Sequence, residues 1–203
     1  MALSNSISDF ILFLTALLWF LGANRGIKDP KLRFRWDLFP VLIGLTAFTG
    51  SIRFAGFDAI TPVSGVLQYA ATTVGVVGLV FAIIQSYEGR IWNRAFLVLL
   101  ALAVGLFIAL LSGAPGWWGL LLQGPAILAI LILALMQFRK DGLVASLTLL
   151  ALVFLAASAL KGMVGQALGS AGLTMDKTDL NDLQHYMMAG AFLLFFLIVR
   201  RVR

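Results

Sequence analysis

The sequence contains no cysteine, a single histidine and few charged side chains. Without cysteine, the chain can form neither a disulfide nor a thiolate metal site. Only 12% of its 203 residues are charged, which is about half of the ~25% found in a soluble globular domain. Because 61% of the residues are hydrophobic and the mean hydropathy is +1.00, the composition excludes an ordinary soluble domain and indicates an integral membrane protein.

Other absences restrict the chemistry that the chain can carry. It has no glycine-rich phosphate loop, so a nucleotide site of the P-loop or dinucleotide type is excluded. One histidine cannot supply both axial ligands of a b-type haem, and the last apolar segment has no lysine that could hold retinal. His185, Asp182 and Asp179 would make only a weak metal site. We therefore expect neither a metal nor a cofactor.

Apolar segments long enough to cross about 30 Å of hydrocarbon recur along the whole chain. Segments of this length satisfy their own backbone hydrogen bonds as helices. The sequence predicts an all-α bundle of seven transmembrane helices that forms a single domain over residues 1–203. Pro62 and Pro115 fall at helix starts, and Pro125 lies inside the fifth helix, where it should produce a kink. The predicted spans are approximately 6–23, 38–57, 62–85, 92–112, 117–138, 143–168 and 180–199.

The basic residues predict the orientation of this bundle. Twelve of the 15 lysines and arginines fall on one side of a seven-helix arrangement, and basic loops mark the cytoplasmic side. We therefore expect the N-terminus outside, the C-terminus in the cytoplasm, and a multi-pass protein of a plasma membrane, the bacterial inner membrane. The formal charge of +6 is spread over short loops, so we expect no nucleic-acid partner. The twelve residues are Arg25, Lys28, Lys31, Arg33, Arg35, Arg90, Arg94, Arg139, Lys140, Arg200, Arg201 and Arg203.

Polar residues inside the predicted spans lie near the outer face. Arg53 and Lys161 are predicted roughly 6 and 10 Å below the outer interface, at 1.5 Å per helical residue. Asp182 and His185 are three residues apart and so share one face of the last helix. At comparable depth lie two glutamines, Gln68 and Gln123. Because ionisable residues at membrane depth are costly, this set predicts a polar cluster that opens outward.

Three interpretations of this cluster remain open. Arg53 and Lys161 could bind a lipid headgroup or a small anion, aided by Gln68 and Gln123. They could instead be structural cations that reach to the interface or pair with Asp58 and Asp182. In the third interpretation, the chain is a structural subunit of a larger complex with a membrane-protein partner. We expect membrane lipids as partners in all three.

One short motif resembles a known family. Residues 181–185 read Asn-Asp-Leu-Gln-His, which is similar to the Asn-Asp-Leu-x-His element of an uncharacterised bacterial seven-helix membrane family. Residues 49–53 read Thr-Gly-Ser-Ile-Arg and end the second helix, and the order of the other elements is also similar. That family in turn resembles the alkaline ceramidase and adiponectin-receptor group of seven-helix membrane hydrolases.

The resemblance implies a hydrolase of lipid amides or esters, in which a zinc ion sits among histidines of helix two and the last helix. His185 would match a last-helix ligand, Ser51 the helix-two serine, and Asp182 an acidic neighbour. However, Arg53 stands where the helix-two histidine is expected, and a guanidinium cannot ligate a metal. Ala189 stands where a second last-helix histidine is expected. The resemblance therefore implies a metal-free enzyme, with His185 as base and Asp182 orienting it, or a protein that is not an enzyme.

Overall fold

The computed structural model describes residues 2–89, 93–170 and 176–201. Every regular element in these ranges is helical, and seven helical segments are long and apolar enough to cross a membrane. The predicted all-α class and the predicted number of membrane-length apolar helices are therefore confirmed. The spanning segments are Leu3–Ala23, Pro30–Phe54, Asp58–Glu88, Asn93–Leu111, Gly116–Gln137, Gly142–Ala159 and Lys177–Arg201.

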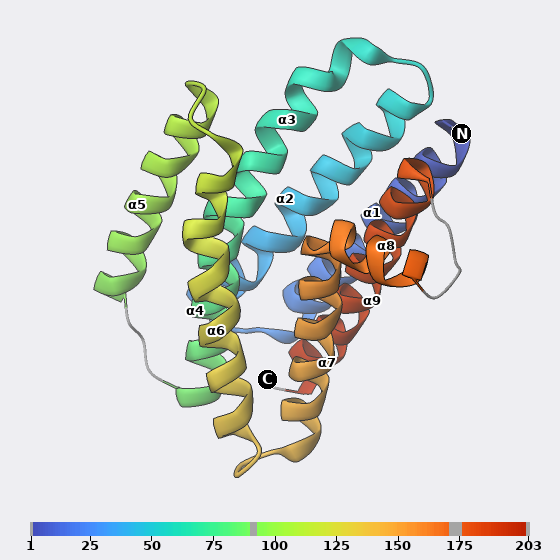
Figure 1. Ribbon diagram of the computed structural model, residues 1–203. Coiled ribbons are helices and arrows are strands. Elements are labelled where there is room, and N and C mark those ends of the chain that lie inside the picture. Colours follow the sequence, from blue (N-terminus) through green and yellow to red (C-terminus); the bar gives the residue numbers. More distant parts are fainter. Residues whose placement is uncertain (1, 90–92, 171–175, 202–203) are drawn as a thin grey trace.

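The helices form an elongated bundle in which α1 begins at one end and α9 finishes at the opposite end (Figure 1). α9 packs against α1 and α7, and α2 packs against α1 and α4. α5 lies at the edge of the bundle (Figure 1). The helices are α1 (Ala2–Gly26), α2 (Pro30–Phe54), α3 (Thr61–Ala70), α4 (Val76–Glu88), α5 (Asn93–Leu111), α6 (Leu120–Gln137), α7 (Gly142–Ala159), α8 (Lys161–Ser170) and α9 (Lys177–Arg201), with the shorter turns η1 (Asp58–Ile60), η2 (Ala71–Gly75) and η3 (Gly116–Gly119).

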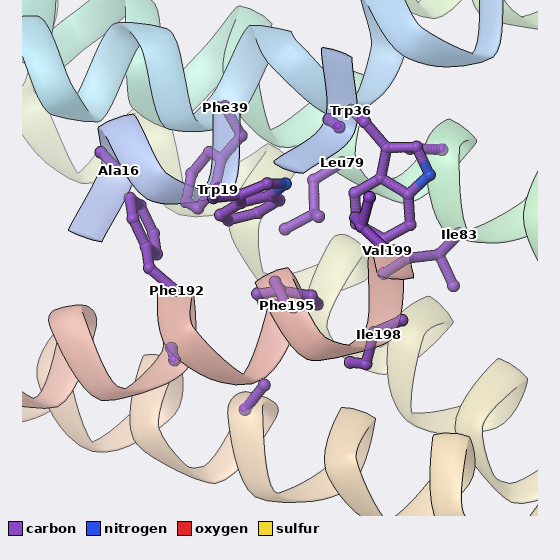
Figure 2. Packing of buried hydrophobic residues seen from close by; sticks show 14 of the residues in the cluster. Ala16, Trp19, Trp36, Phe39, Leu79, Ile83, Phe192, Phe195, Ile198 and Val199 are labelled. Carbon is purple, nitrogen blue, oxygen red and sulfur yellow. The ribbon is translucent and has the colours of Figure 1, made fainter. Parts of the chain in front are cut away.

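Aromatic packing between α1 and α9 sets how these two helices align. Trp19 is fully buried, stacks on Phe195 with ring centroids 4.9 Å apart, and meets the edge of Phe192 at the same distance (Figure 2). Trp36 of α2 contacts both Trp19 and Phe195. Trp19 and Phe195 each lie ten residues after a polar residue, Asp9 and His185 respectively. Since α1 and α9 run parallel, the packing that seats Trp19 against Phe195 also brings Asp9 level with His185.

The second span begins at Pro30 rather than at residue 38. The Asp29 side chain accepts a hydrogen bond from the Lys31 backbone N–H at 2.9 Å, and proline occupies the first helical position, so the helix has both of its usual start signals. Arg33 and Arg35, which the sequence placed in a loop, therefore belong to α2. Arg35 is 2% exposed.

The sixth span ends at Ala159 rather than at residue 168. Leu160 leaves the helical conformation, with φ −98° and ψ 24°, and a separate helix, α8, begins at Lys161. In Figure 1, α8 runs across the end of α7 instead of continuing it. The prediction that Lys161 lies inside the sixth span is therefore wrong: this lysine stands at the corner between α7 and α8.

The prolines and a π-helical turn shape the other spans. Pro62 falls at the start of α3 and Pro115 precedes η3, as predicted. Pro125 lies inside α6. The third span contains the π-helical turn η2, a feature often found at functional sites. α2 packs closely here, because a Cβ added to Gly75 would lie 3.2 Å from the Phe39 ring.

Candidate functional site

A cavity of about 230 Å³ lies between α1, α2, α3, α9 and the start of α8, at the end of the bundle where α9 begins. It is called the polar cavity below, because hydroxyl, amide and charged side chains make up much of its wall. Four residues predicted for a site line it together: Arg53, Gln68, Lys161 and His185. Its other polar lining residues are Asp9, Thr46, Ser64, Thr72, Asn181 and Gln184.

A hydrogen-bond network joins α1 to α9 beside this cavity. Ser8 Oγ donates to Asp182 Oδ1 at 2.6 Å and lies 3.0 Å from His185 Nδ1. Ser4, one turn earlier on α1, donates to the other carboxylate oxygen of Asp182. His185 Nε2 lies 3.4 Å from Asp9 Oδ1. The network forms because Ser4 and Ser8 repeat at four residues on one helix face, and Asp182 and His185 at three on another.

The network also fixes where the protons sit. A serine hydroxyl has one proton, and Ser8 gives it to Asp182, its shortest contact. His185 Nδ1 must therefore donate to the Ser8 oxygen, which leaves Nε2 as the ring nitrogen that faces Asp9. Nε2 and an ionised carboxylate cannot bond unless a proton lies between them. We therefore assign one proton to the His185–Asp9 pair, next to the cavity.

Gly50 of α2 makes room for the Asp9 carboxylate. A Cβ built at position 50 would lie 2.9 Å from Asp9 Cγ and would overlap its oxygens. Asp9 itself is only 4% exposed. α2 therefore closes over Asp9 only because residue 50 has no side chain.

Two cations face the network from the other side. The Arg53 guanidinium lies 4.4 Å from the ring centroid of Phe54, and within the described ranges it forms no hydrogen bond and no ion pair. Lys161 Nζ donates to Asn181 Oδ1 at 2.6 Å, and burial lowers the pKa of this lysine from its ordinary value. Both cations line the same cavity as His185.

Three predicted residues lie elsewhere. Gln123 lines a neighbouring apolar cavity rather than the polar one. Ser51 donates to the backbone carbonyl of Phe48 in its own helix at 2.9 Å and is turned away from the cavity. Asp182 shares a helix with His185, but its carboxylate points to the serines of α1. The predicted orienting contact between Asp182 and His185 is therefore replaced by one from Asp9.

Sequence reasoning missed Ser8 and Asp9. Asp9 lies inside the first apolar segment, and that position was the available signal. Ser8 carried no signal, since a serine in an apolar helix is common. The expected pairing of Arg53 or Lys161 with Asp58 or Asp182 is also absent from the ion pairs of the described residues.

A second buried polar group lies at the opposite end of the bundle. Arg35 donates to Gln85 and, at 2.8 Å, to Asn93 Oδ1, while Gln85 Nε2 donates to Asp29 Oδ2 at 2.8 Å. The guanidinium also lies 4.6 Å from the ring centroid of Phe96. Arg35 thus joins α2, α4 and α5, and its donors are taken up by protein groups, so it differs from Arg53.

The described residues contain no group of three histidine or acidic side chains that could hold a metal. Fold and site together define a class: a helical protein with seven membrane-length apolar helices and a polar cavity at one end of the bundle. The chain belongs to a family of unknown function, DUF6962, whose model matches residues 4–203. No curated protein and no solved structure matches the chain. The family assignment carries no link to alkaline ceramidases or adiponectin receptors.

Proposed function

We propose that this protein binds the anionic headgroup of a lipid, or a small anion, in the polar cavity. We further propose that it lies in a plasma membrane, the bacterial inner membrane, with its N-terminus outside, so that the cavity opens toward the outer leaflet. Most basic residues lie on the side of the predicted bundle opposite the cavity, and this supports the orientation.

The observation that carries the proposal is the Arg53 guanidinium. It lies on the wall of the cavity and has no hydrogen-bond acceptor among the described residues. The side chain is partly exposed, so a ligand in the cavity can reach it, and arginine binds carboxylate and phosphate oxygens through its paired N–H donors. An anionic ligand would supply the acceptor that Arg53 lacks.

The charges around the cavity favour the same ligand. Asp9 and His185 are together neutral on the proton assignment above, and the Asp182 carboxylate, which accepts from Ser4 and Ser8, does not line the cavity. Arg53 and Lys161 are then the charged groups that face a ligand. Gln68 and Gln184 add neutral amide donors to the cavity wall. Such a site suits a ligand with one or two negative charges.

The test is the lipid that remains bound after purification. Arg53→Gln and Lys161→Gln should each reduce a co-purifying anionic lipid, or weaken binding of inorganic phosphate, at least several-fold. Arg94→Gln is the matched control, because Arg94 is an exposed arginine of α5 outside the cavity. Equal lipid content and equal phosphate binding in all four proteins would overturn the proposal.

The geometry of Asp9 and His185 also favours a second candidate, a metal-free lipid hydrolase. The proton shared with Asp9 could move to His185 Nε2, so that the Asp9 carboxylate, stabilised by the imidazolium, takes a proton from a water in the cavity, and the resulting hydroxide would attack the carbonyl carbon of an amide or ester. The leaving amine or alcohol would receive a proton back from Asp9, and Arg53 could stabilise the oxyanion. Ser8 is fully buried and does not line the cavity, so the nucleophile in this mechanism is water.

Release of free fatty acid from an acyl ester or a fatty acyl amide by the purified protein tests this second candidate. His185→Asn should abolish release, because asparagine keeps a polar group but cannot accept the proton. Asp182→Asn should have a smaller effect, since Asp182 contacts the α1 serines rather than His185. If the natural protein releases no more fatty acid than the His185→Asn variant, the hydrolase is ruled out and only the binding function remains.

A further inference from the structure

An apolar cavity adjoins the polar one. A second cavity, of about 140 Å³, lies between α2, α4, α6, α7 and α9. It is called the apolar cavity below. Ile43, Thr72, Gln184 and Met188 line both cavities, so one begins where the other ends. Thr72 belongs to the π-helical turn η2, which thus lies at the junction.

The two cavities lie at different depths along the same helices. Arg53 lines the polar cavity alone, Ile43 lines both, and Phe39 lines the apolar cavity alone. Since these residues are successive points on α2, the wall changes from charged to apolar over roughly 15–20 Å at 1.5 Å per residue. The charged end lies near the end of the bundle and the apolar end toward its middle. A lipid in the adjacent leaflet is arranged in the same way, with its charged headgroup at the membrane surface and its apolar chain toward the middle.

On the basis of the proposed anion-binding function, we infer that the ligand is a single-chain amphiphile with a carboxylate or phosphate headgroup. Its headgroup binds Arg53 and Lys161, and its hydrocarbon chain enters the apolar cavity past Thr72. A free anion would use only the first cavity. Only one chain of a ligand enters, because the second cavity has room for one narrow chain.

The volume of the apolar cavity limits the length of chain that it holds. A dry apolar cavity of about 150 Å³ binds a molecule of the size of benzene, so 140 Å³ accommodates about six carbon atoms. Each methylene that leaves water should strengthen binding about fourfold. The gain should stop once the cavity is full.

A chain-length series on the purified full-length protein tests the inference. Calorimetric titrations with acetate, inorganic phosphate, butanoate, octanoate, octyl phosphate and dodecanoate should show affinity that rises with chain length and levels off after octanoate. Parallel titrations of Arg53→Gln protein correct for the heat released when ligand chains enter the detergent. In Ala126→Leu, the larger side chain fills part of the apolar cavity, so the advantage of octanoate over acetate should fall at least tenfold.

Ala129→Leu is the matched control. It is the same substitution one turn further along α6. Ala126 lines the apolar cavity and also a third cavity between α4, α5 and α6, whereas Ala129 lines only that third cavity, so the control isolates the effect on the apolar cavity. It should keep the chain-length series of the natural protein. Unchanged acetate binding in Ala126→Leu shows that this variant is folded.

The outcomes separate the two proposals. If acetate and octanoate bind equally well to the natural protein, the inference of a single-chain amphiphile is overturned, whereas the proposed anion site stands. A chain-length series that is the same in Ala126→Leu and Ala129→Leu would also overturn the amphiphile, because the chain would then lie elsewhere. Binding of every ligand equally to natural protein and Arg53→Gln would overturn the proposed function itself.

Discussion

The imidazole of His185 on α9 lies 3.4 Å from the carboxylate of Asp9 on α1, across 176 positions of the chain. Neither residue has another charged partner as close among the described residues. The contact closes the bundle, because α1 and α9 are the first and the last helix. It also places a shared proton at the wall of the polar cavity.

Replacing Asp9 tests the assignment of this proton. Asparagine can donate from its amide to the lone pair of His185 Nε2, so Asp9→Asn should keep the contact and most of the stability. Asp9→Ala leaves the ring nitrogen buried and unpaired, which typically costs about 1–3 kcal/mol. Thermal unfolding in detergent measures the difference. If asparagine is as destabilising as alanine, the shared proton is wrongly assigned.

The close approach of α2 to Asp9 gives a second prediction. Gly50→Ala inserts a methyl group where the Asp9 carboxylate lies, and overpacking of this kind typically costs about 1–3 kcal/mol. Gly65→Ala is the control, because a Cβ at position 65 of α3 would meet nothing within 4 Å and alanine favours a helix. It should leave the unfolding temperature unchanged or raise it. Equal effects of the two substitutions would contradict the packing around Asp9.

Seven helices could be predicted because each apolar run is long enough to span hydrocarbon, and this depends on composition alone. The boundaries were harder, since they depend on single contacts. Asp29 starts α2 eight residues before the apolar run begins, and Leu160 ends α7 although the apolar run continues. Arg35 could not be predicted as buried, because its partners Gln85 and Asn93 come from other helices.

The site could be predicted as a set of residues but not as a set of contacts. Arg53, Gln68, Lys161 and His185 were predicted to lie at one depth, and they line one cavity. Depth follows from position in a span, whereas direction follows from helix rotation, which packing sets. Gln123 has the right depth but belongs to α6, which adjoins the apolar cavity. The contacts of α1 with α9 depend in the same way on Trp19, whose place between Phe192 and Phe195 no local pattern indicates.

Arg35 gives a third prediction, on stability rather than binding. Arg35→Ala leaves the oxygens of Gln85 and Asn93 without their donor, at about 1–3 kcal/mol for each buried acceptor. Arg35→Lys should rescue little, because an ammonium cannot reproduce the two-branched geometry. Lys31→Ala, an exposed cation of the same helix, should have no effect. Protease sensitivity near the start of α5 should rise in both Arg35 variants, and unchanged sensitivity would contradict the role of Arg35 in holding α5.

Asp141 supplies the pH dependence. Backbone N–H donors of Val144 and Leu143 and the Arg201 side chain, 3.0 Å away, lower the pKa of Asp141 from its ordinary value of 3.8. A lowered pKa means that the ionised side chain stabilises the fold above that ordinary value, and that this contribution is lost as the pH falls through the lowered one. Asp141→Ala should therefore unfold at a lower temperature than the natural protein at neutral pH, and the gap should narrow as the pH falls below the ordinary pKa of 3.8. Asp141→Asn can still cap α7, so its unfolding temperature should lie between those of Asp141→Ala and the natural protein. A difference in unfolding temperature that is the same at all pH values would contradict the stabilising role of ionised Asp141.

The absence of cysteine makes the proposed orientation directly measurable. A single cysteine can be placed at Lys177, exposed at the start of α9, or at Arg139, exposed between α6 and α7. If the basic side is cytoplasmic, a membrane-impermeant maleimide should label Lys177→Cys in intact cells and Arg139→Cys only after the membrane is opened. The reverse pattern would invert the bundle. The polar cavity would then face the cytoplasm, and its amphiphile would come from the inner leaflet.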